Sequence, residues 1–251
     1  MSFKKILFSV CILLSNTLYQ QEIQPRLDLS AQQAWEYFGN KSTIKPQIIK
    51  VQGSQYYNEE FQLSDLKYFG RKMESIGYMR YDAYNDVIEM ADTPDIERSE
   101  ILLLKNNDVI ATINEKEYVF LLYDEKDIKN KKGYMIRLYS GNNYSLYQKK
   151  VKIFKEAEKT KAGITESKPP RYASKTDFYI QKRDQKPELI KISKKSLINF
   201  FENQSEIKKF IKENKLKVRE IESIISIIEF ADKIDHLWYI HKFLYKFLLN
   251  I

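Results

Sequence analysis

Cysteine, histidine and glycine are scarce in this chain of 251 residues, which contains one cysteine, two histidines and seven glycines. A single cysteine excludes a disulfide scaffold and a thiolate zinc site. The two histidines, His236 and His241, are too few for a multi-histidine metal centre, and the scattered glycines form no phosphate-binding loop. The sequence therefore predicts no catalytic residue, no metal site and no cofactor.

Apolar and charged residues are both abundant, at 43% and 30% of the chain. This composition differs from that of disordered chains, in which apolar residues are too few to form a core. A chain of this length can bury a core in one large domain or two small ones. We therefore expect a folded protein.

The N-terminus has the layout of an export signal. Lys4 and Lys5 precede an apolar run over residues 6–14, and small or polar residues follow. The run is too short to cross a bilayer, which takes about 20 apolar residues. We expect residues 1–20 to be a signal peptide, and its cleavage would also remove Cys11. The alternative is a short N-terminal core helix or anchor.

Residues 54–192 predict an antiparallel β-rich domain. Short runs of β-branched and aromatic residues alternate with turn signals such as Asn106-Asn107-Asp108 and Gly141-Asn142-Asn143. Connections this short favour hairpins, because a parallel crossover needs a dozen or more residues. The expected strands cover residues 59–63, 78–90, 100–105, 109–113, 117–123, 133–140, 144–154, 178–180 and 189–192.

The regions flanking this domain predict helices. Residues 193–234 change to a helical period, with Ser193 or Ser196 and then Ser205 as candidate N-caps, and the clearest helix covers residues 217–234. Residues 21–53 predict a segment with a short helix at 30–39, and residues 235–251 an amphipathic apolar tail. The fold class expected is α+β, an antiparallel meander followed by about three short helices.

Charge is distributed unevenly along the chain. Residues 54–131 contain 17 acidic and 10 basic residues, a formal charge of −7, whereas residues 145–219 contain 21 basic and 9 acidic residues, or +12. Basic regions favour nucleic acid through counterion release. Here the basic residues are mostly lysine and form no arginine-rich or aromatic-interleaved recognition motif, and an exported protein rarely meets nucleic acid. We therefore expect a solvated surface and no nucleic-acid partner.

One stretch of the predicted strand 78–90 concentrates functional side chains. Its weak binding candidates are Arg80, Tyr81, Tyr84, Asp86 and Glu89. In one continuous strand, positions 82 and 86 would lie about 13 Å apart. Paired glycosidase carboxylates lie roughly 5 to 9.5 Å apart, so these two predict no hydrolase unless another strand supplies a partner. Cross-strand ion pairs and tyrosine packing are the favoured interpretation.

The tail carries a second set of candidates, Trp238, Tyr239, Phe243 and Phe247. The tail is too short for a membrane span, but an amphipathic helix of this length can lie on a bilayer, bind a partner or pack on its own domain. Packing on its own domain is favoured.

A resemblance rests on several stretches of the chain. They are residues 80–89, Gly133-Tyr134-Met135-Ile136, residues 146–150, Phe178-Tyr179-Ile180 and residues 210–217. In these, the sequence resembles exported envelope proteins of the Bacteroidota type that have no assigned activity, over about residues 50 to 230. The resemblance implies an export signal, a β-rich body and terminal helices, and it implies no catalytic residue.

Together these observations predict an exported protein of the periplasm, cell envelope or medium that acts as a non-enzymatic binding or structural module with an envelope partner. The first alternative is a protein held on a membrane surface by its C-terminal helix. The second is a hydrolase that uses carboxylates from separate strands.

Overall fold

The computed structural model describes residues 33, 36, 39–41, 51–157 and 169–249. The chain divides into two units, Met1–Ser30 and Ala31–Ile251, and all described residues belong to the second. The expected signal peptide lies outside the described residues, as does nearly all of the helix expected at 30–39.

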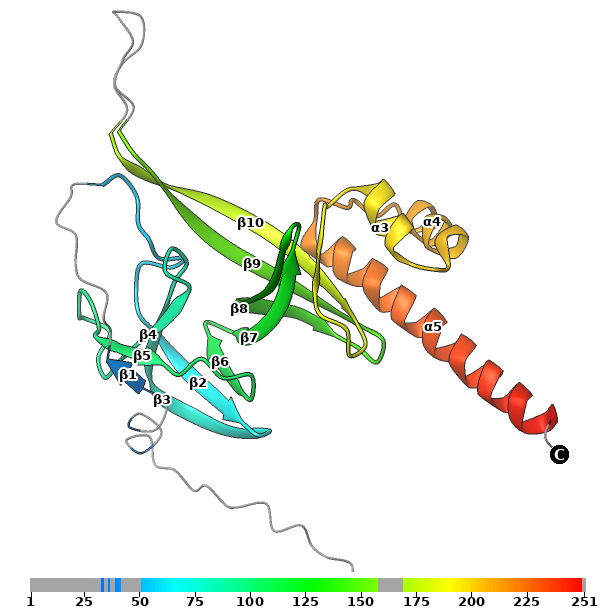
Figure 1. Ribbon diagram of the computed structural model, residues 1–251, viewed down its shortest axis with the longest axis horizontal. Helices are drawn as coiled ribbons and strands as arrows, with labels where there is room; N and C mark the ends of the chain where they lie inside the picture. Colours follow the sequence, from blue (N-terminus) through cyan, green and yellow to red (C-terminus); the bar gives the residue numbers. More distant parts are fainter. Residues whose placement is uncertain (1–32, 34–35, 37–38, 42–50, 158–168, 250–251) are drawn as a thin grey trace, which may run out of the picture. The chain divides into compact units, whose positions relative to one another are not determined.

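Eleven strands and three helices make up the described part of the chain (Figure 1). The strands are β1 (Gly39–Lys41), β2 (Gln62–Tyr68), β3 (Arg71–Asp82), β4 (Val87–Ala91), β5 (Ile101–Leu103), β6 (Val109–Ile113), β7 (Lys116–Glu125), β8 (Ile128–Ser140), β9 (Tyr144–Lys155), β10 (Arg171–Lys182) and β11 (Glu188–Ile190). The helices are α3 (Lys194–Phe200), α4 (Gln204–Glu213) and α5 (Ile221–Leu249). The expected α+β class, a meander followed by three helices, is confirmed.

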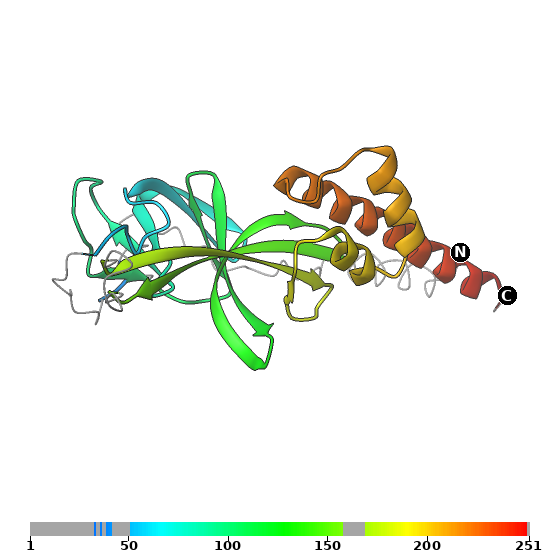
Figure 2. The same cartoon turned by 90° about the horizontal axis from the view of Figure 1, so that it is seen from above.

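The strands form one sheet in the order β1-β5-β4-β3-β2-β6-β7-β11-β10-β9-β8, and β7 also pairs with β8. The pairings from β7 through β8, β9, β10 and β11 therefore return to β7. All strand pairs are antiparallel except β11–β7, which meet in a single parallel bridge between Glu188 and Asp124. The longest pair, β9 and β10, runs side by side through twelve residue pairs (Figures 1 and 2).

The predicted strand 78–90 is two strands joined by a turn, and predicting a single strand there was wrong. β3 ends at Asp82 and β4 begins at Val87. The Asp82 carboxylate accepts the backbone N–H groups of Tyr84 and Asn85 at 3.0 and 2.9 Å, and Asp86 has a φ of 55°. An aspartate that bonds the amides two and three residues ahead stabilises a turn in place of an extended chain.

The helices pack on one end of the sheet. Ile224 and Ile228 of α5 join Ile207 and Ile211 of α4 in a core cluster with Leu146 and other strand residues. Figure 2 shows the three helices together, and Phe210 of α4 stacks on Phe230 of α5 with ring centroids 3.9 Å apart. α5 is longer than expected, because it continues past residue 234 to Leu249.

The helix N-termini test the three serine caps. Ser193 caps α3, and its hydroxyl oxygen accepts the Ser196 N–H at 3.1 Å, so this prediction is confirmed. Ser205 lies inside α4, whose N-cap is Asn203, so that prediction was wrong.

Candidate functional site

The five binding candidates that the sequence predicted lie in different environments of the structure. Arg80 and Tyr81 are neighbours in β3, so their side chains point to opposite faces of the sheet. Tyr84 and Asp86 lie in the turn, and Glu89 lies in β4 opposite Arg80. The structure therefore brings Arg80 and Glu89 together on one side, and Tyr81 and Asp86 together on the other.

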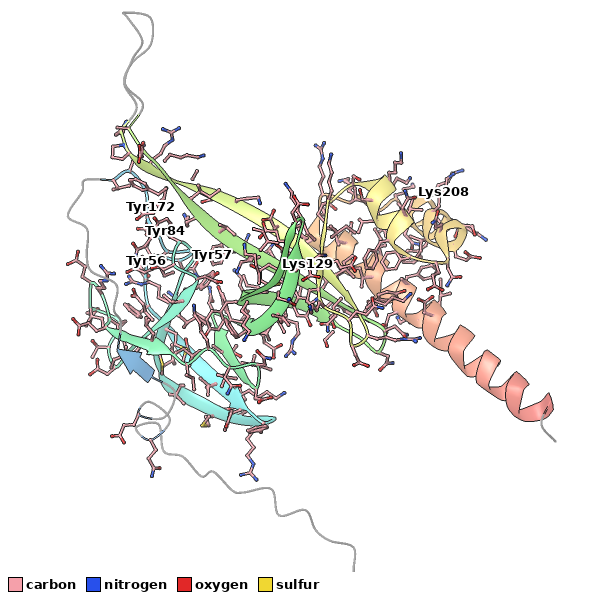
Figure 3. All side chains as sticks on the ribbon, in the orientation of Figure 1. Tyr56, Tyr57, Tyr84, Lys129, Tyr172 and Lys208 are labelled. Carbon is pink, nitrogen blue, oxygen red and sulfur yellow. The ribbon has the colours of Figure 1, made fainter. Side chains whose placement is uncertain are left out.

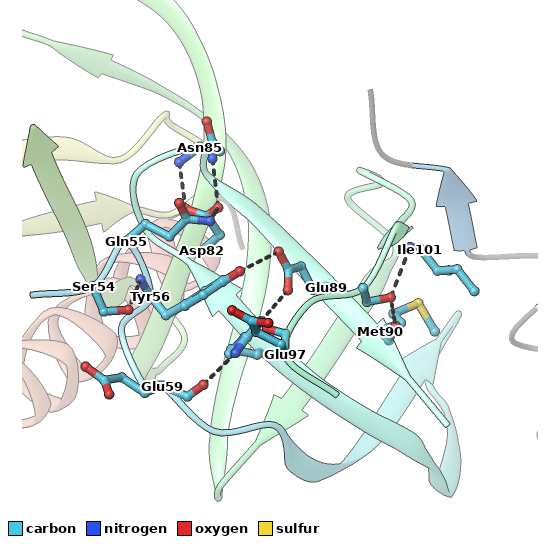
Figure 4. A network of polar contacts seen from close by, with 12 residues as sticks. Ser54, Gln55, Tyr56, Glu59, Asp82, Asn85, Glu89, Met90, Glu97 and Ile101 are labelled. Atoms are coloured by element: carbon cyan, nitrogen blue, oxygen red, sulfur yellow. Dashed lines mark hydrogen bonds and ion pairs between the residues drawn. The ribbon is translucent and has the colours of Figure 1, made fainter. Parts of the chain in front are cut away.

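Arg80 and Glu89 form a buried ion pair. The Arg80 Nη2 lies 2.8 Å from Glu89 Oε2, and the side chains are 5% and 3% exposed. The guanidinium also donates to the backbone oxygens of Glu59 and Glu97, at 2.6 and 2.9 Å (Figure 4). The Tyr56 hydroxyl donates to the second Glu89 oxygen at 3.0 Å. Burial, then the charge of Glu89, raises the pKa of Tyr56, so its proton stays in place.

Two aromatic rings enclose the guanidinium. Its central carbon lies 3.5 Å from the ring centroid of Tyr56 and 4.1 Å from that of Phe61. A desolvated cation–π contact contributes about 2 kcal/mol. Arg80 therefore connects three segments of the chain, the approach to β2, the β3–β4 hairpin and the loop that precedes β5.

This arrangement forms the inner wall of a cleft of about 920 Å³. Its lining residues come from segment 51–61, Arg80, loop 94–98 and Tyr172 of β10. The lining residues include four exposed acidic residues, Glu59, Glu60, Asp95 and Glu97, and the half-buried Arg98. We call this the acidic cleft.

The segment 52–57 is held in place at both ends. The Gln52 N–H donates to the Pro170 oxygen, and the Gln52 oxygen accepts the Tyr172 N–H, at 2.8 and 3.0 Å. Further along, the Gln55 amide donates to Asp82 Oδ2 at 2.8 Å (Figure 4). The segment thus connects β10 with the β3–β4 turn and forms one side of the acidic cleft.

Tyr84 is 46% exposed and borders this region. Its ring lies edge-on to Tyr172, with centroids 5.3 Å apart (Figure 3). Of the five candidates, Arg80 lines the acidic cleft, Glu89 pairs with it, and Tyr84 contacts a lining residue.

Tyr81 and Asp86 belong to a separate cluster, in which Tyr81 is buried and Asp86 is half-buried. Asp86 accepts hydrogen bonds from the Tyr81 hydroxyl at 2.6 Å and from the Lys149 ammonium at 3.0 Å. Lys149 also donates to the backbone oxygen of Tyr134 at 3.1 Å. Burial lowers the pKa of Lys149, and the charge of Asp86 opposes that change. The cluster satisfies its own charges and connects the turn to β8 and β9.

Asp232 of α5 was missed by sequence reasoning. Its buried carboxylate accepts the backbone N–H groups of Asn142, Asn143 and Tyr144 at 3.1, 2.6 and 2.8 Å. An aspartate within a helical stretch looks like a solvent-facing residue, and no local signal points to a turn about 90 residues away. Lys149 and Tyr172 were missed for the same reason.

The tail candidates Trp238, Tyr239, Phe243 and Phe247 lie on the helical backbone of α5, and their side chains lie outside the described set, as do His236 and His241. Among the described residues, no helix has both the length and the apolar character of a membrane span. Nor do three or more histidine, cysteine or acidic side chains gather as metal ligands within that part of the chain.

The three carboxylates of the predicted strand 78–90 that were considered above, Asp82, Asp86 and Glu89, all have hydrogen-bond donors. Asp82 accepts backbone N–H groups of the turn, Asp86 accepts a hydrogen bond from Lys149, and Glu89 accepts one from Arg80.

Comparison of the chain with protein-family models, with curated proteins and with solved structures gave no match.

Proposed function

We propose that this chain is an exported binding protein that holds a cationic ligand in the acidic cleft. The observation that carries the proposal is the charge of the lining. Because Glu89 neutralises Arg80, four acidic lining residues are opposed only by the charge of Arg98 within the lining, which gives a formal charge of −3. A concave surface with one sign of charge attracts a ligand of the opposite sign. The ligand class is an amine or a basic segment of a partner protein.

The contacts of Arg80 and Glu89 favour binding over catalysis. Both terminal nitrogens of Arg80 and both oxygens of Glu89 already have partners. A general acid or base must reach the proton that it transfers. This pair gives the cleft a rigid wall, and the exposed carboxylates at its rim contact the ligand.

The N-terminal layout of Lys4, Lys5 and the apolar run at 6–14 supports export. We expect the mature chain to start within residues 17–21 and to be recovered from the periplasm or the medium. Cell fractionation with N-terminal sequencing tests this, and recovery of the uncleaved chain in the cytoplasm would contradict it.

Binding is tested by titrating the protein with hexalysine and with spermidine in a calorimeter. Replacing Glu59, Glu60, Asp95 and Glu97 by glutamine should abolish binding, because the cleft loses its charge. These side chains are exposed, so the substitutions leave the core intact.

The matched control changes four exposed acidic residues outside the cleft, Asp127, Asp184, Glu213 and Glu220. It has the same net charge as the cleft variant and should bind as the wild type does. Equal weakening in both variants, or unchanged binding in the cleft variant, would refute the proposal.

A further inference from the structure

A groove of about 650 Å³ lies between α3 and α4. Three exposed lysines line it, Lys194 and Lys195 from α3 and Lys208 from α4, and we call them the groove lysines. Figure 3 labels Lys208. The half-buried Ile198 adds an apolar contact, and no carboxylate lines the groove.

Within the described part of the chain, the groove lysines have no acidic partner, because none of the ion pairs there includes Lys194, Lys195 or Lys208. The surrounding stretch, residues 191–219, contains nine basic and three acidic residues, a formal charge of +6. Like charges gathered this closely repel one another, so the arrangement favours a negatively charged partner.

Packing of the helices does not require these lysines. Leu197 of α3 and Ile207 and Ile211 of α4 are buried in the core cluster, whereas the groove lysines are exposed. The same two helices therefore combine an apolar face that stabilises the fold with a basic surface that the core does not use.

The next element along the chain, α5, ends in an apolar segment of the kind that can lie on a bilayer surface. α5 follows α4 and continues as one helix to Leu249, and its last part has an aromatic and apolar sequence with Lys242 and Lys246. Stable attachment to a bilayer surface takes two signals, for example an apolar segment and a basic patch.

We propose that the groove between α3 and α4 binds the phosphate headgroups of an anionic bilayer. Lysine ammonium groups act as point charges toward phosphate, and each lysine near an anionic surface strengthens binding about fivefold. The acidic cleft lies on other elements, so this interaction is separate from the proposed cationic ligand.

The test is flotation of the full chain with vesicles of phosphatidylcholine alone and with added phosphatidylglycerol. We expect phosphatidylglycerol to strengthen binding. Changing the three groove lysines to glutamine should weaken that added binding roughly a hundredfold, while binding to phosphatidylcholine alone stays the same. Far-ultraviolet circular dichroism verifies that the variant is folded.

The control changes Lys72, Lys129 and Lys175 to glutamine, which removes the same charge from lysines that already have acidic partners. It should bind phosphatidylglycerol vesicles within about twofold of the wild type, because these lysines lie outside the groove and their charges are already compensated. Loss of such exposed ion pairs also costs the fold little. Equal weakening in both variants, or full binding by the groove variant, would overturn the proposal. So would binding of inorganic phosphate in the groove as tight as binding to the vesicles, because the partner would then be free phosphate.

Discussion

The carboxylate of Asp232 accepts the backbone N–H of Asn143 at 2.6 Å, although 89 positions separate the two residues in the sequence. Asp232 lies in α5, and Asn143 lies in the turn between β8 and β9. The same carboxylate binds the two neighbouring amides. This aspartate therefore fixes the position of the long helix on the sheet.

Asp232→Ala should lower the free energy of unfolding by about 3 kcal/mol, because it leaves three amides of the turn without their charged acceptor. Urea unfolding measures the loss. Asp127→Ala removes an exposed carboxylate from another turn and should change stability by less than about 0.5 kcal/mol. A loss no larger than that of the control would show that water replaces the Asp232 contacts.

Gly133→Ala should destabilise the protein by about 3 kcal/mol through overpacking. A Cβ at this position would overlap Asp86 Oδ2 and lie 2.7 Å from Lys149 Nζ, so this partly buried ion pair would have to separate. The control is Gly70→Ala, where nothing lies within 4 Å and only the φ of 78° opposes alanine, at a cost of about 1 kcal/mol. Thermal unfolding of both variants measures the two losses of stability. A larger loss for Gly70→Ala than for Gly133→Ala would contradict the prediction.

Arg80→Leu should lower the free energy of unfolding by about 3 to 5 kcal/mol, because Glu89 would remain buried without its partner. The double variant Arg80→Leu with Glu89→Leu should lose less than the sum of the single losses. A double-mutant cycle by urea unfolding measures this coupling. Arg137→Leu, from the more exposed pair with Glu117, should cost about 1 kcal/mol or less. Additive losses at Arg80 and Glu89 would contradict the buried pair.

Stability should fall as the pH rises above about 10. Burial raises the pKa of Tyr81, Tyr118 and Tyr134 above the ordinary 10.0, so above that pH the unfolded chain releases tyrosine protons that the folded chain retains. Each such tyrosine lowers the free energy of unfolding by about 1.4 kcal/mol per pH unit.

Lys149 changes stability in the opposite direction, because it raises the free energy of unfolding as the pH rises, but only below the ordinary lysine pKa. Because burial lowers its pKa, its contribution to stability grows as the pH rises toward the ordinary lysine value of 10.5 and then stays constant. Urea unfolding at pH 9, 10.5 and 11.5, roughly bracketing the two ordinary values, measures both effects. Unchanged stability between the two higher pH values would contradict the burial of these phenols.

Tyr179→Phe should leave stability unchanged or raise it by about 1 kcal/mol. The Tyr179 hydroxyl is buried and has no hydrogen-bond partner in the described part of the chain. Tyr144→Phe is the matched change, and it should be destabilising because the Tyr144 hydroxyl donates to Asp235. Thermal unfolding compares the two, and a larger loss at Tyr179 would reveal a partner for its hydroxyl.

Local patterns predicted most of the secondary structure. The Ser193 cap and the apolar stripe through Ile224 and Ile228 indicated two of the helices, because capping and helical period act within a few residues. The strand over 78–90 was wrong because apolar and aromatic residues continue through the turn. The decisive contacts, from the Asp82 carboxylate to two amides, give no signal in hydropathy.

The candidate site was only partly predictable. Arg80 and Glu89 were named as candidates, and their pairing follows from the β3–β4 register. Tyr56, Phe61 and Tyr172 were not named, because their approach to Arg80 or to the cleft depends on where segment 51–61 and β10 pack.

By itself, the sequence determined the α+β class, the hairpin-rich body, the helical C-terminal part and the division of charge, since these depend on composition and on short-range periodicity. Only the tertiary structure decided that Arg80 would be neutralised by Glu89 beneath a rim of carboxylates, and that three lysines of two helices would share one groove. Such sites bring together side chains from elements that are distant in the chain, and the packing that joins them has no local pattern.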